Sequence, residues 1–140
     1  MITELEDMRI NVKLKLAALW ASFMFLYIYV DYFHLYMPGS IKDVLAGKMY
    51  VFDITQVALL LGLVLVSIPA LMIFAAVALS AKVNRRANII VAAVYILYTL
   101  FNFAGAAWIH MVYGAVIEVV LLLLIIRCAW KWPKQESPIT

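Results

Sequence analysis

The sequence predicts an all-α protein, a four-helix transmembrane bundle with a short interfacial helix between its first and second spans. Composition is the first reason. The chain of 140 residues is 68% hydrophobic and only 14% charged, whereas soluble domains contain about 45–50% apolar and about 25% charged residues. The second reason is that the apolar residues form four long runs. As a helix, each run can cross the roughly 30 Å hydrocarbon core of a bilayer.

The first segment, residues 1–15, is polar and is expected to be a cytoplasmic head. Its acidic residues and the long apolar run after it argue against a cleavable signal peptide. The first span is expected over residues 16–37 of a single membrane domain, residues 16–130. Pro38 and Gly39 end this span, because proline disfavours a helical residue before it and glycine permits a turn.

A short helix is expected next, over residues 41–46. Ser40 and Asp43 have the spacing of a capping box, in which the hydroxyl caps the first turn and the acid reaches back to the cap. The apolar residues of this segment would face lipid or protein, and its lysines would face the headgroups. The helix would then lie in the membrane interface and partly cover the outer mouth of the bundle.

The second and third spans follow on either side of a short basic loop. The second is expected over residues 57–79, which contain no charged residue. A cap at Asp53 would open it and Pro69 would kink it. The third is expected over residues 87–110, with Asn84 as its cap.

A turn at Gly114 is expected to precede the fourth span, residues 115–130, and residues 131–140 are expected to form a cytoplasmic tail.

Basic residues indicate the orientation of the spans. Nine of the eleven lie in the head, the second loop and the tail, and two lie in the first loop. An even number of spans places head, second loop and tail on one side, which the positive-inside rule makes cytoplasmic.

A net charge of +3 could suggest a nucleic-acid partner, but the basic residues lie at the ends of the apolar runs. Membrane orientation explains them there, so the expected partner is the lipid bilayer and not a nucleic acid. The single cysteine, Cys128, excludes an internal disulfide.

Asp31 and His34 have half of the carboxylate-x-x-His pattern of metal-binding bundles. The second half is missing, because Leu121 stands three residues after Glu118. No metal and no cofactor is therefore expected.

Polar residues gather in the outer halves of the predicted spans, whereas the inner halves are expected to be almost wholly apolar. Asp31 and His34 share one face of the first span, and Glu118 lies at a similar depth on the fourth. Ionisable groups are costly inside a membrane, so they usually face the bundle interior and mark a functional site. The expected ligand-binding residues, which would share a pocket open to the outer side, are Tyr27, Asp31, His34, Gln56, Asn102 and Glu118.

Structural roles for these residues stay open at this point. Asp31 and Glu118 could be buried partners in interhelical hydrogen bonds. His34 could be solvated at the interface, and Gln56 could only cap a helix. Whether His110, at the mouth of the third span, joins the pocket is also open.

Four stretches of the chain are distinctive: NVKLKLAALW (residues 11–20), YVDYFHLYMPG (residues 29–39), VNR (residues 83–85) and GAVIE (residues 114–118). They resemble a family of small bacterial four-helix membrane proteins that is known only as a domain of unknown function. In outline the chain is also similar to the DoxX-like group of four-helix proteins. The resemblance covers nearly the whole chain and implies a four-span protein of the bacterial inner membrane, but it brings no catalytic residue.

Three kinds of function fit these features. The favoured one is binding or transport of a small hydrophobic or polar molecule, or of a proton, through the outer pocket. Four short spans make a thin wall, so transport would need a homo-oligomer. The second is a membrane enzyme, with no catalytic residue assigned, whose paired carboxylates do acid–base chemistry on a lipid-soluble substrate. The third is a structural or accessory membrane subunit.

Overall fold

Helices make up most of the described chain. The computed structural model describes residues 8–102 and 108–134. In chain order, the elements of these ranges are α1 (Val12–His34), α2 (Ser40–Leu45), β1 (Lys48–Met49), β2 (Phe52–Asp53), α3 (Gln56–Ala78), α4 (Ala81–Asn102) and α5 (Ile109–Trp130). β1 and β2 form an antiparallel hairpin in which Met49 pairs with Phe52. Apart from this two-residue pairing, the all-α prediction is confirmed.

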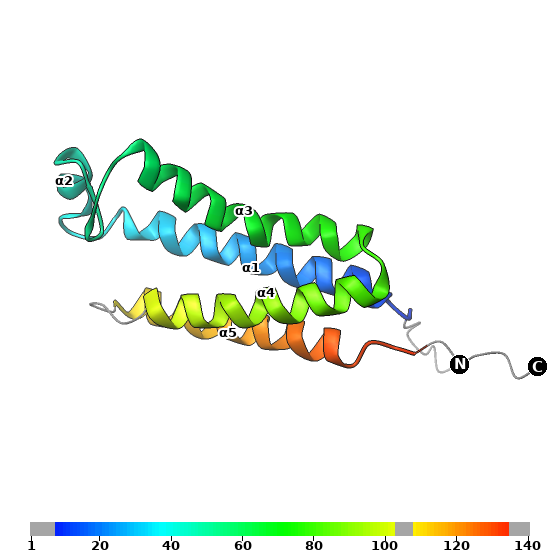
Figure 1. Ribbon diagram of the computed structural model, residues 1–140. Helices are drawn as coiled ribbons and strands as arrows, with labels where there is room; N and C mark the ends of the chain where they lie inside the picture. The colour runs from blue at the N-terminus through cyan, green and yellow to red at the C-terminus, as the bar shows by residue number, and fades with distance from the viewer. Residues whose placement is uncertain (1–7, 103–107, 135–140) are drawn as a thin grey trace, which may run out of the picture.

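Four long helices lie side by side, and successive long helices run in opposite directions (Figure 1). α2 and the hairpin lie at one end, which we call the hairpin end. The start of α1, the link from α3 to α4 and the end of α5 lie at the opposite end (Figure 1). We call it the basic end, because Lys15, Lys82 and Lys131 are there. α1 packs against both α3 and α5, whereas α4 packs mainly against α5.

Three helices, α1, α3 and α5, are long and apolar enough to cross a membrane. α4 is not among them when the described residues are considered. Its first two turns carry the cations Lys82, Arg85 and Arg86 together with Asn84 and Asn88, so its apolar stretch is shorter. In the described residues, therefore, three helices have the length and apolar character of membrane spans.

α4 begins at Ala81, six residues before the predicted start of the third span, so the predicted helix cap at Asn84 is wrong. Asn84 consequently lies inside the helix and is not its cap. Its amide is satisfied there, since Nδ2 donates a hydrogen bond to the carbonyl oxygen of Ala76 in α3 at 2.6 Å. A partner from another helix thus replaces the local capping role that the sequence suggests.

The predicted end of the third span and start of the fourth are also wrong. Trp108 is the N-cap of α5, which begins at Ile109, so residues 108–110 do not belong to the third span. Gly114 lies inside α5 and makes no turn. Its missing side chain leaves room for a neighbouring helix, and Val30 of α1 packs there.

Helix caps at the hairpin end differ from the prediction as well. α2 begins at Ser40, and its N-cap is Gly39, whose φ of 94° is a left-handed conformation that glycine adopts without strain. No side-chain hydrogen bond caps this helix, so the capping box of Ser40 and Asp43 is wrong. α3 is capped by Thr55, whose hydroxyl accepts a first-turn N–H at 3.1 Å, and not by Asp53. A short helix is present as expected, and its position in a membrane interface stays a prediction.

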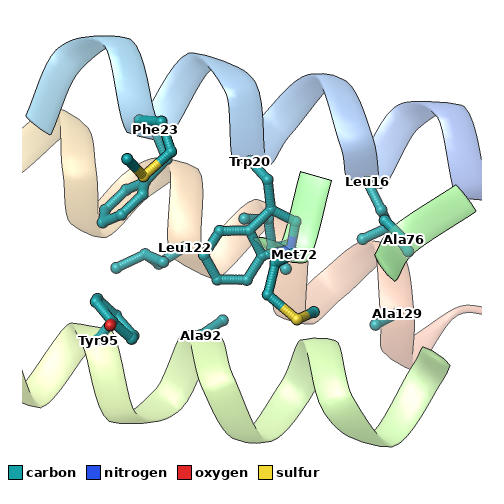
Figure 2. Packing of buried hydrophobic residues seen from close by; sticks show 11 residues of the cluster. Leu16, Trp20, Phe23, Met72, Ala76, Ala92, Tyr95, Leu122 and Ala129 are labelled. Atoms are coloured by element: carbon teal, nitrogen blue, oxygen red, sulfur yellow. The ribbon is translucent and has the colours of Figure 1, made fainter. Parts of the chain in front are cut away.

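The hydrophobic core lies between the long helices, with Trp20 of α1 projecting into its middle (Figure 2). Leu16, Trp20 and Phe23 of α1 are fully buried. Trp20 and Phe23 meet edge to face with ring centroids 5.8 Å apart. Side chains of the other helices surround them: Met72, Ala76, Ala92, Tyr95, Leu122, Ile125 and Ala129. The alanines allow the helices to approach closely, as small residues do in membrane bundles.

Candidate functional site

A cavity of about 520 Å³ lies at the hairpin end, between α1, α2 and the hairpin, and we call it the hairpin-end cavity. Its polar lining comes from Asp31 and His34 of α1, Ser40 and Asp43 of α2, and Lys48 and Tyr50 of the hairpin segment. Apolar side chains, among them Ile28, Leu35 and Met37, complete the wall. The volume falls within the range of about 300–1,000 Å³ that small-molecule sites occupy.

Tyr50 connects the hairpin to the two ionisable residues of α1. Its hydroxyl donates a hydrogen bond to Oδ1 of Asp31 at 3.3 Å, and its ring lies against the ring of His34 with centroids 4.3 Å apart. Burial around the hydroxyl raises the pKa of Tyr50 above its ordinary value, and the Asp31 carboxylate adds to the rise. The hydroxyl therefore keeps its proton at neutral pH and can donate it to Asp31.

The backbone of Tyr50 is held in an unusual conformation. Its φ is 55°, in the left-handed region, which costs a residue with a Cβ roughly 1–2 kcal/mol. Strained residues of this kind persist only where surrounding contacts fix them, and they cluster at functional sites. Here the contacts are the hydrogen bond to Asp31 and the tilted ring contact with His34.

His34 has an unsatisfied ring nitrogen. Its Nδ1 atom is shielded from solvent and has no hydrogen-bond partner within the described parts of the chain. Buried polar atoms are nearly always hydrogen-bonded in folded proteins, so this nitrogen is free to bond a water or another small group. Nε2 of His110, in the first turn of α5, is in the same condition, but His110 does not line the hairpin-end cavity.

Glu118 lies inside the bundle and not in this cavity. It is only 5% exposed, and Oε2 of its carboxylate accepts a hydrogen bond from the Thr99 hydroxyl of α4 at 3.1 Å. Since α1 and α5 are antiparallel (Figure 1) and Gly114 meets Val30, Glu118 comes level with Tyr27. That is roughly one helical turn, or about 5.4 Å, deeper than Asp31. The two carboxylates thus lie at different depths, and Glu118 does not line the hairpin-end cavity; a pocket shared by both stays a prediction.

The other expected site residues are divided among three places. Tyr27 lies about one turn below Asp31 on α1, near the level of Glu118, and its hydroxyl donates to the Tyr98 hydroxyl of α4 at 3.3 Å. Gln56 is the first residue of α3, Asn102 is the last described residue of α4, and both are exposed. The structure therefore brings Asp31 and His34 together with Tyr50, and it leaves Gln56 and Asn102 outside this group.

The expectation of almost wholly apolar inner halves is wrong, because a buried polar seam crosses the basic half of the bundle. Nε1 of Trp20 donates to Oδ1 of Asn88 at 2.7 Å, and Nδ2 of Asn88 donates to Oδ1 of Asn84 at 2.6 Å. Asn84 continues to the carbonyl oxygen of Ala76. Both asparagines are fully buried. We call this chain the asparagine seam; it joins α1, α4 and α3.

Lys13 extends this polar set to the surface of the basic end. Its Nζ donates to the carbonyl oxygens of Val77 at 3.1 Å and Leu79 at 2.7 Å. These carbonyls stand at the end of α3, where the helix itself offers them no donor. A lysine at a helix C-terminus also has a favourable interaction with the helix dipole. From the sequence, Lys13 indicates only the orientation of the first span. The structure shows that it also caps the end of α3.

Comparison with known proteins identifies the family of the chain. A family model described as a family of unknown function, DUF6326, matches residues 2–138. No curated protein and no solved structure matches the chain. The expected likeness to the DoxX-like group and the bacterial origin stay predictions. Because the model covers nearly the whole chain, the protein belongs to DUF6326, a family of unknown function.

Proposed function

We propose that the protein is a four-span protein of the bacterial inner membrane, with both termini cytoplasmic, that binds a small molecule in the hairpin-end cavity. One observation carries the proposal: Asp31, Tyr50 and His34 meet in this cavity, and Nδ1 of His34 is buried without a partner in the described residues. A ligand that donates hydrogen bonds would satisfy the imidazole nitrogen and the Asp31 carboxylate together.

The lining favours a molecule with a donating polar group, such as a hydroxyl or a protonated amine, and an apolar body. Asp31 and Asp43 supply carboxylate oxygens for the donor, and Ile28 and Met37 supply apolar surface. This combination, a mostly apolar wall with a few convergent polar groups, is typical of small-molecule sites.

Binding is favoured over passage through the bundle. Below the cavity, Glu118 is bonded to Thr99. In the basic half, the side-chain polar groups of the asparagine seam are hydrogen-bonded to other groups of the protein, beside the fully buried Leu16 and Trp20. A path for a polar solute would have to break these bonds in a medium that offers few substitutes.

The arrangement of the ends supports four spans. The basic residues of α4 lie at the same end as the start of α1 and the end of α5 (Figure 1). Aromatic residues lie near both ends, as in interfacial belts: Tyr29, Tyr32 and Tyr36 near the hairpin end, and Trp130 and Trp132 at the basic end. The exposed residues Val94, Leu97 and Phe101 give α4 an apolar outer surface that suits lipid.

Native mass spectrometry in a mild detergent tests the binding proposal, because it reports oligomeric state and retained small molecules together. The wild-type protein, purified from its own membrane, is expected to retain a small molecule. Asp31→Asn removes the charge but keeps the size of the side chain. Hydrogen bonds to charged groups contribute about 1.5–3 kcal/mol, so retention should weaken by about tenfold or more.

Asp53→Asn is the matched control. It makes the same chemical change at the same end of the molecule, but Asp53 lies in β2 and does not line the cavity. Its retention should equal that of the wild type. A wild-type protein without any retained molecule, or equal retention in both variants, would contradict the proposal.

A further inference from the structure

A second hollow lies at the basic end, in the angle between α1 and α5, and we call it the basic groove. It has a volume of about 490 Å³. Two helix stripes line it, with matching spacing. Lys15, Ala18, Leu19 and Ser22 come from α1, and Leu124, Arg127, Cys128 and Lys131 come from the end of α5. Each set follows the i, i+3, i+4, i+7 pattern of a single helix face.

Charge and apolar surface are segregated along this groove. Lys15 begins the α1 stripe and Lys131 ends the α5 stripe, so both cations stand at the outer rim of the basic end, with Arg127 one turn inward. Further towards the middle of the bundle, the lining is Leu19 and Leu124 with small side chains. Small side chains leave room, so the groove continues from its cationic rim as an apolar channel.

These cations have no acidic neighbour among the described residues. The described acids are Asp31, Asp43, Asp53 and Glu118, and all four lie in the hairpin half. The groove lining likewise contains three cations and no described acid. A positive rim on an apolar channel is complementary to one kind of molecule: an anionic headgroup with an acyl chain.

We infer that the basic groove is a binding site for an anionic phospholipid of the cytoplasmic leaflet. Lys15, Arg127 and Lys131 would hold the phosphate, and one acyl chain would lie along Leu19 and Leu124. The inference rests on the membrane orientation proposed above but not on the hairpin-end cavity. It goes beyond a general attraction of basic residues to anionic lipid, because only three of the cations at this end line the groove.

Cys128 makes a direct test possible. It is the single cysteine of the chain, it is partly exposed and it lines the groove, so a thiol-reactive maleimide reports occupancy. The protein in detergent is labelled with and without phosphatidylglycerol. At a lipid concentration ten times Kd, mass action leaves about one site in eleven free, so labelling should slow about tenfold. Phosphatidylcholine and inorganic phosphate serve as comparison probes and should give little protection.

Two sets of substitutions distinguish the cations that line the groove from the other cations of the basic end. Lys15→Gln, Arg127→Gln and Lys131→Gln combined should raise the Kd for phosphatidylglycerol by at least about tenfold, since each removes a cation from the anion site. Lys82→Gln combined with Lys134→Gln removes exposed cations that do not line the groove, and the Kd should not change. All five side chains are exposed, so folding should be preserved, and circular dichroism checks this.

Three results would overturn the inference. Equal protection by phosphatidylcholine would mean that the groove takes acyl chains without regard to headgroup. Equal protection by inorganic phosphate would mean a site for a small anion. An unchanged Kd in the triple variant would mean that the cations of the groove do not hold the lipid. A negative result with Asp31→Asn at the hairpin end would affect none of these measurements.

Discussion

Val30 of α1 packs directly on the backbone of Gly114 in α5. A Cβ atom built on Gly114 would overlap Cγ2 of Val30 and would lie 3.5 Å from Cγ1 and 3.6 Å from Cβ. The two helices therefore meet here with no room for another side-chain atom. This contact fixes the register of α5 against α1, and the register in turn places Glu118 level with Tyr27 and one turn below Asp31.

Gly114→Ala is expected to destabilise the fold. Val30 is β-branched and has one strongly preferred side-chain rotamer in a helix, so it cannot turn aside freely from the new methyl group. Overpacking of this kind typically costs about 1–3 kcal/mol. Thermal unfolding followed by circular dichroism in detergent would show a lower midpoint than that of the wild type.

Gly62→Ala is the matched control for this change. Gly62 lies in α3, and a Cβ built there meets nothing within 4 Å. Alanine favours a helix over glycine by about 0.8–1.0 kcal/mol, so this variant should be at least as stable as the wild type. If Gly114→Ala matched it in stability, the contact with Val30 would not be tight in solution.

Gly114 also shows why some helix boundaries could not be predicted from sequence. A glycine inside an apolar run is compatible with a turn and equally with close helix contact. The choice depends on a residue 84 positions earlier in the chain, Val30, which no local pattern identifies. The existence of the long helices is different, because long apolar runs are local signals, and these predictions agree with α1 and α3. α1 ends at His34, however, three residues before the end predicted from Pro38 and Gly39.

Asn88→Leu is expected to destabilise the protein by about 2–4 kcal/mol. The change leaves Nε1 of Trp20 without its acceptor and Oδ1 of Asn84 without its donor, and each unsatisfied buried group costs about 1–3 kcal/mol. Asn102→Leu changes the same residue type in the same helix, but at an exposed position, and should stay within about 0.5 kcal/mol of the wild type. Thermal unfolding of both variants gives the comparison.

A double-mutant cycle isolates the bond between Trp20 and Asn88. Trp20→Phe with Asn88→Leu removes both partners, so the pair should cost less than the sum of the single changes. Interhelical hydrogen bonds in membrane proteins give couplings of about 0.6 kcal/mol on average, with a maximum of about 1.7. Strict additivity would show that the bond contributes nothing to the packing of α1 against α4.

The asparagine seam has a sequence signal, but the signal is ambiguous. The buried residues of α4 are Asn84, Asn88, Ala92, Tyr95 and Thr99, and their spacings of three or four residues are those of one packed helix face. This spacing identifies the face of α4 that turns inward, which includes Asn88 and Thr99. It does not reveal that Trp20 and Glu118 are their partners, because periodicity within one helix contains no information about its neighbours.

Tyr50→Phe is expected to weaken ligand retention in the hairpin-end cavity while leaving the fold intact. The phenylalanine ring can still stack on His34, but the hydrogen bond to Asp31 is lost. Such a bond contributes about 0.5–1.5 kcal/mol, so the affinity should fall by about two- to tenfold. Native mass spectrometry measures the change. Tyr29→Phe, at an exposed tyrosine of α1 outside the cavity, should behave as the wild type.

Nothing in the sequence around Tyr50 predicts its role. Left-handed φ values favour glycine and asparagine, so a tyrosine gives no signal for the turn that it makes. Its contacts with Asp31 and His34 arise only after the chain has reversed at Gly39, passed through α2 and formed the hairpin. The acid and the histidine can be recognised as candidate residues from sequence, whereas the group that joins them depends on this loop geometry.

The orientation of the four long helices is open to a test that also decides whether α4 crosses the membrane. In a Cys128→Ser background, single cysteines are placed by Lys48→Cys in the hairpin, Lys82→Cys at the start of α4 and Lys134→Cys after α5; all three positions are exposed. Intact cells are then treated with a membrane-impermeant maleimide. With four spans and cytoplasmic termini, the cysteine at position 48 should react, and those at positions 82 and 134 should react only after permeabilisation.

The cysteine at position 134 distinguishes four spans from three. If only α1, α3 and α5 cross the membrane, as their apolar length alone would require, the chain crosses an odd number of times and position 134 lies outside, while positions 48 and 82 behave as before. If α4 also crosses, position 134 returns to the cytoplasm, where the positive-inside rule places the cations at the end of α5. Reaction at position 134 in intact cells would therefore remove α4 from the spans and reverse the proposed location of the C-terminus.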